Sequence, residues 1–314
     1  MTPFRNTPRW IATAAALLLS TACAGEAPEA DANDEAVRPK VIIIGIDGIR
    51  PDVLADVPTP NLDALADAGL FIDDARTGFP SVSGPGWSSM LNGVWPEKHG
   101  VLGNDFEDDR YDEYPDFLTR IEQVRPDLNT FAVADWRPLV ASDDQRHPIG
   151  DGIDRKEVLD GYETGWAEGD SMSVELAVSH LSDADPDALF VYLGNPDEVS
   201  HGAGSIGQEY REAIALADRH VGMLIEAIQS RASYAAEDWL VLSSTDHGRT
   251  EQGGHGGDTP EERTIYLLAS GSSVDPSLRP DAAFIVDVPV TALAHLGITI
   301  DPAWRLDGQP IGIR

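Results

Sequence analysis

The chain has 314 residues, 42% of them hydrophobic, which is enough for one large α/β domain or two smaller ones. Acidic residues outnumber basic residues by 54 to 22, and the net charge of −32 argues against binding to nucleic acid or to an anionic membrane surface. An anionic substrate would need a local positive centre in such a field, and a bound metal ion would supply one.

The N-terminus has the pattern of an export signal, predicted over residues 1–24. Arg5 and Arg9 precede the apolar run IATAAALLL, which is too short to span a membrane comfortably. Two processing routes are open, because residues 22–24 form an A-x-A cleavage site and LSTAC resembles a lipobox with Cys23 as the lipid-carrying residue. Cys23 is the only cysteine of the chain, which favours the lipoprotein route and excludes an internal disulfide.

A polar, acidic segment follows over residues 25–39 and is predicted to be a disordered linker. The protein is therefore expected to be exported to the periplasm or cell surface, with the lipid as its only membrane contact. Residues 40–314 are predicted to form the folded domain. Within it, residues 105–170 are rich in Asp, Pro and Trp with weak periodicity, which predicts a lid or insertion beside the sheet.

From residue 41 onwards, apolar runs alternate with helical stretches. Four runs are predicted as buried strands: VIIIGI (41–46), TFAVAD (130–135), ALFVYLG (188–194) and WLVLSSTD (239–246). Residues 61–69 and 207–230 have the apolar spacing of helices. Strands alternating with helices predict an α/β fold with a mostly parallel, doubly wound sheet.

Polar side chains follow three of these predicted strands. Asp47 comes directly after the first run, Asp197 follows the third run after a Gly-Asn-Pro turn, and Asp246 and His247 end the fourth. Each of them alone could be an ordinary turn residue. Ligand sites of open α/β sheets form beyond the carboxyl ends of the strands, so the coincidence predicts one shared site.

Residue spacing within these segments predicts that the shared site binds metal. Asp197 and His201 are four residues apart, and His255 follows in a loop in which five glycines between 248 and 257 allow the chain to fold back. A set of Asp and His without cysteine suits zinc or manganese and is typical of a catalytic site. Six ligands predict two metal ions. The candidate ligands are Asp47, Asp197, His201, Asp246, His247 and His255.

The segment FPSVSGPGWSSMLNG offers a nucleophile. Ser83 is placed best, because Gly84-Pro85-Gly86 follows it and the next residues predict a short helix. Backbone N–H groups at a helix N-terminus favour a bound phosphate and an ionised hydroxyl. The alternative is that Ser83 is only an N-cap residue. The other hydroxyls nearby are those of Thr77, Ser81, Ser88 and Ser89.

Six segments, in their order along the chain, carry a family resemblance. They are IDG (46–48), SGP (83–85), NGVWPEKHG (92–100), DEVSH (197–201), DHG (246–248) and HGG (255–257). In this order they resemble the alkaline phosphatase superfamily, specifically its nucleotide pyrophosphatase/phosphodiesterase-like branch. The match runs from about residue 40 to the end of the chain and is specific as a set.

The resemblance implies how the ligands divide between two zinc ions. One ion would be held by Asp197, His201 and His255. The other would be held by Asp47, Asp246 and His247. Ser83 would bridge toward the second ion and attack phosphorus, forming a phosphoseryl intermediate. The branch also places an Asn 21 positions after the nucleophile as a donor to a phosphate oxygen, and that position is Asn104 here.

The implied activity is hydrolysis of small phosphate esters, in particular diesters or nucleotide pyrophosphates. Diesterases of this branch typically carry Thr followed by Phe-Pro-Asn, whereas Ser-Gly-Pro-Gly stands here, so an aromatic residue that grips a base is not assured. Trp87, Trp95 or Trp136 could serve. The alternatives are a phosphomonoesterase or phosphonate hydrolase on the same scaffold, or a surface-anchored binding lipoprotein without activity.

Overall fold

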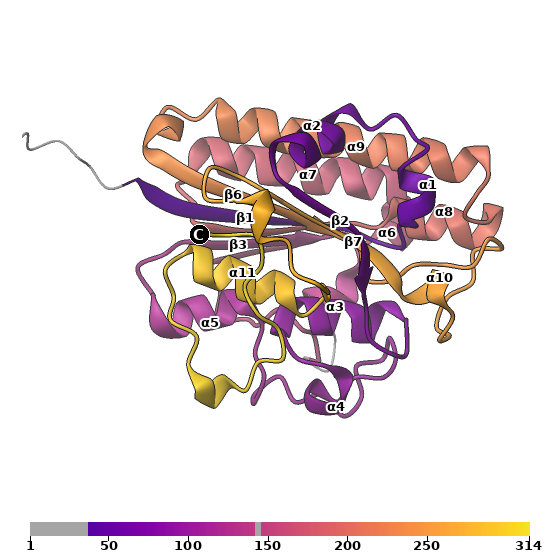
Figure 1. Ribbon diagram of the computed structural model, residues 1–314, viewed down its shortest axis with the longest axis horizontal. Coiled ribbons are helices and arrows are strands. Elements are labelled where there is room, and N and C mark those ends of the chain that lie inside the picture. The colour runs from indigo at the N-terminus through magenta and orange to yellow at the C-terminus, as the bar shows by residue number, and fades with distance from the viewer. Residues whose placement is uncertain (1–36, 142–145) are drawn as a thin grey trace, which may run out of the picture. The chain divides into compact units, whose positions relative to one another are not determined.

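The computed structural model describes residues 37–141 and 146–314 (Figure 1). The predicted signal peptide at residues 1–24, the lipidation candidate Cys23 and most of the predicted linker lie outside the described residues. Across the two described ranges, no helix is both long enough and apolar enough to cross a membrane.

A single seven-stranded sheet organises the described chain. Its strands are β1 (Arg38–Ile46), β2 (Leu70–Arg76), β3 (Thr130–Ala134), β4 (Arg155–Val158), β5 (Ala188–Leu193), β6 (Glu237–Ser244) and β7 (Thr264–Ser270). They lie in the order β2-β7-β6-β1-β5-β3-β4. The five strands from β6 to β4 are parallel, while β7 runs antiparallel to both β6 and β2. The prediction of a mostly parallel α/β sheet is therefore confirmed.

Helices cover both faces of the sheet, as Figure 1 shows. On one face lie α1 (Pro51–Leu54), α2 (Pro60–Ala68), α7 (Trp166–Asp183), α8 (Asn195–Ala203) and α9 (Gln208–Gln229). On the other lie α3 (Ser83–Asn92), α4 (Pro96–His99), α5 (Phe117–Val124) and α11 (Asp287–His295). Short helices α6 (Gly161–Thr164) and α10 (Pro260–Arg263) lie in the connections.

The side chains of β1 point alternately into two hydrophobic cores, one on each face of the sheet. Val41 and Ile43 point into the core beneath α3, α5 and α11, whereas Ile42, Ile44 and Ile46 point into the core beneath α2, α7 and α9. A strand buried on both faces has no need of polar alternation, which is why it reads as a continuous hydrophobic run. All four predicted strands and both predicted helices are present at the expected places.

The structure differs from the sequence-based expectation in two respects. The segment expected as a lid or insertion, residues 105–170, contributes β3 and β4 to the sheet itself, because the TFAVA stretch is entirely buried. In addition, β1 begins at Arg38, inside the expected linker, since residues 38–40 pair with the start of β6. The apolar run 130–135 already predicts β3, whereas β4 and the start of β1 are fixed by pairing with another strand, for which their polar composition carries no signal.

Candidate active site

The candidate site lies where three neighbouring parallel strands, β6, β1 and β5, end side by side. Asp47 follows β1 directly, and Asp246 and His247 follow β6 after Thr245. From β5 the chain passes into α8, which carries Asp197 in its first turn. The predicted shared site at the carboxyl ends of the strands is thus assembled, with one partner on a helix rather than in a turn.

Three ligand candidates form what we call the inner group: Asp47, Asp246 and His247. One ligand atom of each lies within 4.8 Å of the others, and all three side chains are buried. His247 Nε2 is 3.2 Å from Asp246 Oδ2 and 3.6 Å from Asp47 Oδ1. Donor atoms around a tetrahedral zinc ion stand about 3.3 Å apart, because Zn–N and Zn–O bonds are about 2.0–2.1 Å long. These separations fit one zinc ion.

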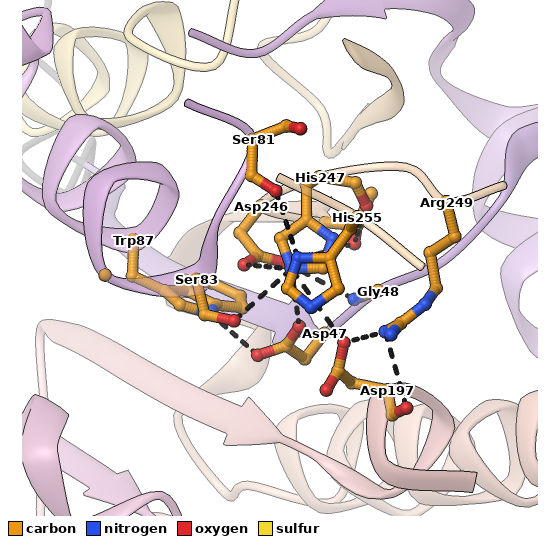
Figure 2. Close-up of polar contacts among 12 residues, drawn as sticks. Asp47, Gly48, Ser81, Ser83, Trp87, Asp197, Asp246, His247, Arg249 and His255 are labelled. Carbon is orange, nitrogen blue, oxygen red and sulfur yellow. Dashed lines mark hydrogen bonds and ion pairs between the residues drawn. The ribbon is translucent and has the colours of Figure 1, made fainter. Parts of the chain in front are cut away.

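The other three candidates form the outer group: Asp197, His201 and His255. His201 Nε2 lies 3.1 Å from Asp197 Oδ2 and 3.3 Å from His255 Nε2. These separations also fit a tetrahedral ion. His201 is exposed and the other two are partly buried, so the outer group faces solvent more than the inner one. The rings of His247 and His255 stack with centroids 3.9 Å apart and join the two groups (Figure 2).

Two buried oxygen atoms of the inner group lack a hydrogen-bond donor: Asp47 Oδ1 and Asp246 Oδ2. The second oxygen of each carboxylate is occupied. Trp87 Nε1 and the Tyr192 hydroxyl donate to Asp47 Oδ2 at 2.9 and 2.7 Å, and the Gly48 N–H donates to Asp246 Oδ1 at 3.3 Å. A buried carboxylate oxygen without a partner is costly, and a divalent cation between the two would remove that cost.

Hydrogen bonds also orient the imidazole rings. His247 Nδ1–H donates to the Gly248 carbonyl and His255 Nδ1–H donates to the Ser81 carbonyl, both at 3.0 Å. Because these partners can only accept, they assign the proton to Nδ1 and leave the Nε2 lone pairs facing the site. Such contacts behind the ligands hold the rings in the orientation that metal binding needs.

Burial and the neighbouring carboxylates shift the pKa values of the inner group. Burial, followed by the charge of Asp246, raises the pKa of Asp47 well above its usual range. Burial also raises the pKa of Asp246 to about 7 and lowers the pKa of His247 well below its usual range. Two carboxylates this close cannot both ionise cheaply, and a bound divalent cation reverses that balance.

Ser83 is the first residue of α3, with Val82 in the N-cap position, so the structure does not make it the N-cap residue. Its hydroxyl oxygen lies 3.3 Å from His247 Nε2, beside the inner group (Figure 2). Three of the other four candidate hydroxyls bond partners outside the two ligand groups. The Ser81 hydroxyl donates to the Gly257 carbonyl, Ser88 bonds Tyr111, and Ser89 bonds His99.

Asn104 lies against the first turn of α3. Its Oδ1 accepts a hydrogen bond from the Gly84 N–H at 2.7 Å. A side chain at Gly84 would meet the Gly103 carbonyl oxygen at 2.2 Å, so only glycine allows this approach. Gly86 plays the same part on the other side, since a Cβ there would lie 2.9 Å from the Asp246 carbonyl oxygen. The Ser-Gly-Pro-Gly sequence therefore serves close packing of α3 against the site.

A pocket of about 180 Å³ opens in front of both groups and is lined by Ser83 and Asn104. Of the tryptophans considered from the sequence, only Trp136 lines it. Trp87 is fully buried beneath Asp47, and Trp95 packs edge-to-face on Phe284 away from the pocket. The structure adds Tyr162, Trp166 and Glu198 to the lining. Glu198 lies within the DEVSH segment next to Asp197, whereas Tyr162 and Trp166 lie in none of the motifs.

This sheet, with two carboxylate–imidazole groups beside a serine at a helix N-terminus, defines an alkaline phosphatase-like protein. The chain belongs to the family described as type I phosphodiesterase / nucleotide pyrophosphatase, whose profile matches residues 41–142 and 130–255. The matched ranges contain all six ligand candidates, Ser83 and Asn104.

Individual relatives agree with this membership. The chain is 26% identical over 246 residues to ectonucleotide pyrophosphatase/phosphodiesterase family member 7 of Homo sapiens, covering 71% of this chain and 50% of that protein. It is 22% identical over 294 residues to the Bos taurus bis(5'-adenosyl)-triphosphatase ENPP4, covering 88% and 57%. The chain thus spans about half the length of these curated relatives.

A solved structure shows the same fold. Murine ectonucleotide pyrophosphatase/phosphodiesterase 5, in an inactive form in complex with AMP, superposes with a TM-score of 0.65 at 15% sequence identity. The superposition covers 84% of this chain and 96% of that one. At this identity the likeness establishes the fold and leaves the substrate of this chain open.

Proposed function

We propose that this protein is a metal-dependent hydrolase of phosphoric esters, with phosphodiesters or nucleotide pyrophosphates as its substrates. The observation that carries the proposal is the pair of unpartnered buried oxygens, Asp47 Oδ1 and Asp246 Oδ2, beside the Ser83 hydroxyl. Two zinc ions, or manganese in their place, would be held by the inner and outer groups. When bound, they would neutralise the substrate phosphate and lower the pKa of the Ser83 hydroxyl.

Ser83 is the proposed nucleophile. Its Oγ forms a bond to phosphorus while the bond to the leaving alcohol oxygen breaks, and its proton passes to solvent. The leaving oxygen takes up a proton in turn. Water then attacks the phosphoseryl group, breaks the Oγ–P bond and regenerates the hydroxyl. Asn104 is the proposed donor to a phosphate oxygen during both steps, and its position against Gly84 supports this role.

Substrate preference tests the proposal. We expect kcat/KM for a bis-aryl phosphate diester or a nucleoside diphosphate ester to exceed that for an aryl phosphate monoester. A large preference for the monoester would contradict the diesterase assignment and leave a phosphomonoesterase. A protein that retains two metal ions and hydrolyses none of these esters, nor a phosphonate, would instead be a binding protein.

The nucleophile is tested by Ser83→Ala. We expect turnover to fall by about 10³-fold or more while metal content stays unchanged, because the ligands remain in place. The matched control is Ser88→Ala, one turn further along α3, whose hydroxyl bonds Gly84 and Tyr111 and should be dispensable for turnover. Normal turnover in Ser83→Ala would refute the nucleophile assignment.

We also propose that the protein is exported and anchored through a lipid on Cys23. Arg5, Arg9 and the short apolar run after them support export, and the single cysteine within LSTAC supports the anchor. Cleavage at the A-x-A site of residues 22–24 would instead release a soluble protein.

A further inference from the structure

The side chain of a fully buried arginine, Arg249, lies beside Asp197 of the outer group (Figure 2). Its Nη1 donates to Asp197 Oδ1, and its Nη2 lies 3.1 Å from His201 Nε2. The guanidinium is anchored from the other side, since Nε and Nη2 donate to the Gly253 carbonyl at 2.9 and 2.6 Å. Arg249 therefore contacts two outer ligands and cannot reach substrate in the pocket.

The local chain is shaped to keep this arginine in place. Gly48 adopts a positive φ of 65°, and a Cβ there would lie 2.7 Å from Arg249 Nη1 and 2.6 Å from Asp197 Oδ1. Arg50 Nη1 donates to the Arg249 carbonyl at 3.1 Å and fixes the backbone. Burial and anchoring leave the guanidinium no path to solvent, so its charge stays beside the outer group.

The two groups consequently differ in electrostatic balance. The inner carboxylates receive their hydrogen bonds from neutral donors, namely Trp87, Tyr192 and the Gly48 N–H. The inner group thus offers a cation two uncompensated carboxylates in a buried place. The outer group has one carboxylate, that of Asp197, and its charge is already matched by Arg249.

We propose that Arg249 makes the two metal positions unequal, so that the inner group binds a divalent ion tightly while the outer group exchanges its ion readily. A cation entering the outer group gains the attraction of one carboxylate and meets the repulsion of a fixed positive charge. A cation entering the inner group gains two carboxylates, and Arg249 contacts Asp197 and His201 of the outer group instead of these inner carboxylates. This inference rests on the two-metal site of the proposed function, and it makes the outer ion the one through which external metal concentration controls turnover.

Stepwise metal binding to the purified wild-type protein tests the inference. Metal-free protein is titrated with Zn²⁺ in competition with a chelator of known affinity, and metal content is measured after dialysis against that chelator. We expect two binding steps whose dissociation constants differ by about tenfold or more, with one ion retained on dialysis. Two ions binding with equal affinity would overturn the inference alone. Less than one ion per chain would contradict the proposed function as well.

Two substitutions separate charge from shape. Arg249→Met removes the charge at similar length, and we expect it to tighten the outer position by about tenfold while the inner affinity stays as the internal reference. Arg249→Lys keeps the charge without the guanidinium fork, and the two affinities should remain apart. The surface control is Arg219→Met on α9, which removes one positive charge from an exposed position and should change neither affinity.

The opposite result for the outer position is decisive. If Arg249→Met weakens outer binding, or if the Met and Lys variants behave alike, Arg249 acts by holding Asp197 in position and the inference is wrong. Circular dichroism establishes that each variant is folded before its affinities are compared. Should Arg249→Met not fold, the comparison of the Lys variant with wild type remains, and equal affinities in the wild-type titration would still overturn the inference.

Discussion

A neighbouring residue orients the Asn104 side chain for its proposed role as a donor to a substrate phosphate. Its oxygen is occupied by the Gly84 N–H, which leaves the two amide N–H groups to donate to a substrate phosphate. We expect Asn104→Ala to lower kcat/KM. The free energy of activation should rise by about 2.7–4 kcal/mol, as it does when an oxyanion-hole donor is removed. Steady-state kinetics with a diester measures this, and metal content should stay unchanged. An unaltered rate would remove Asn104 from the site.

His99 contributes to the stability of the fold and has no role in the proposed hydrolysis. Its Nδ1 accepts the Val101 N–H at 3.1 Å, so Nε2–H faces the Ser89 hydroxyl at 3.0 Å. Burial, followed by the charge of Arg110, lowers the pKa of His99 to about 3. A neutral ring is therefore built into the fold, although its histidine-glycine segment belongs to the family signature.

The pH dependence of this contribution has a definite sign. The unfolded His99 has a pKa of about 6.5, so the contribution is complete above that pH and is lost as pH falls toward the folded value. When the pH is lowered from 7 to 4.5, the free energy of unfolding should decrease. We expect about 2–3 kcal/mol of this decrease to come from His99. Urea unfolding of wild type and His99→Gln at both pH values measures it. Equal losses in the two proteins would contradict the assignment.

At the scale of secondary-structure elements, the start of α8 sets the geometry of the outer group. Asp170 of α7 is fully buried, and its Oδ1 accepts the Gly194 N–H at 2.7 Å, just before α8 begins. Burial raises the pKa of Asp170 well above its usual range and raises the pKa of its neighbour Asp135 to about 7. The pair therefore holds a proton at neutral pH, which lets two carboxyl groups lie together under α8.

Asp170→Ala tests this link between α7 and α8. Removing the acceptor leaves the Gly194 N–H buried without a partner, so we expect a loss of about 1–3 kcal/mol in unfolding free energy. Outer-site metal affinity should fall with it, because Asp197 lies at the start of α8. Asp170→Asn keeps an acceptor oxygen and is the matched control, with a much smaller effect. Thermal unfolding measures the loss of stability, and zinc titration measures the outer-site affinity. Equal behaviour of the Ala and Asn variants would contradict the proposed link between α7 and α8.

At the scale of the whole molecule, the proposed lipid anchor at Cys23 would hold the protein on a membrane. Expression of the full sequence in a bacterial host tests the proposed anchor at Cys23. The wild-type protein should be found in the membrane fraction, because acyl chains supply the membrane affinity. Its mass should show a lipid on Cys23 as the first residue of the processed chain. Cys23→Ser should move the protein into the soluble fraction. A soluble wild-type protein beginning at Gly25 would show cleavage at the A-x-A site instead.

Much of the fold and of the site can be predicted from the sequence, because the responsible signals are local. The apolar runs 41–46 and 188–194 indicate strands buried on both faces of a parallel sheet, and the carboxyl ends of such strands lie at one edge of the sheet. The four-residue spacing of Asp197 and His201 indicates that they can bind one ion, and the family resemblance implies the division of the ligand candidates into two groups. None of this requires knowledge of which strands are neighbours.

Only the tertiary structure decides how each ligand is held. The contact of Arg249 with Asp197 joins residues 52 positions apart, and that of Trp87 with Asp47 joins residues 40 apart. Such pairs leave no periodicity in the sequence, because the sheet order that brings them together depends on packing across the whole domain. The sequence by itself predicted the candidate donor set, and the folded chain brings these residues together in two groups. The orientation of its carboxylate oxygens and the cation beside Asp197 came only from the folded chain, since burial and long-range contact set both.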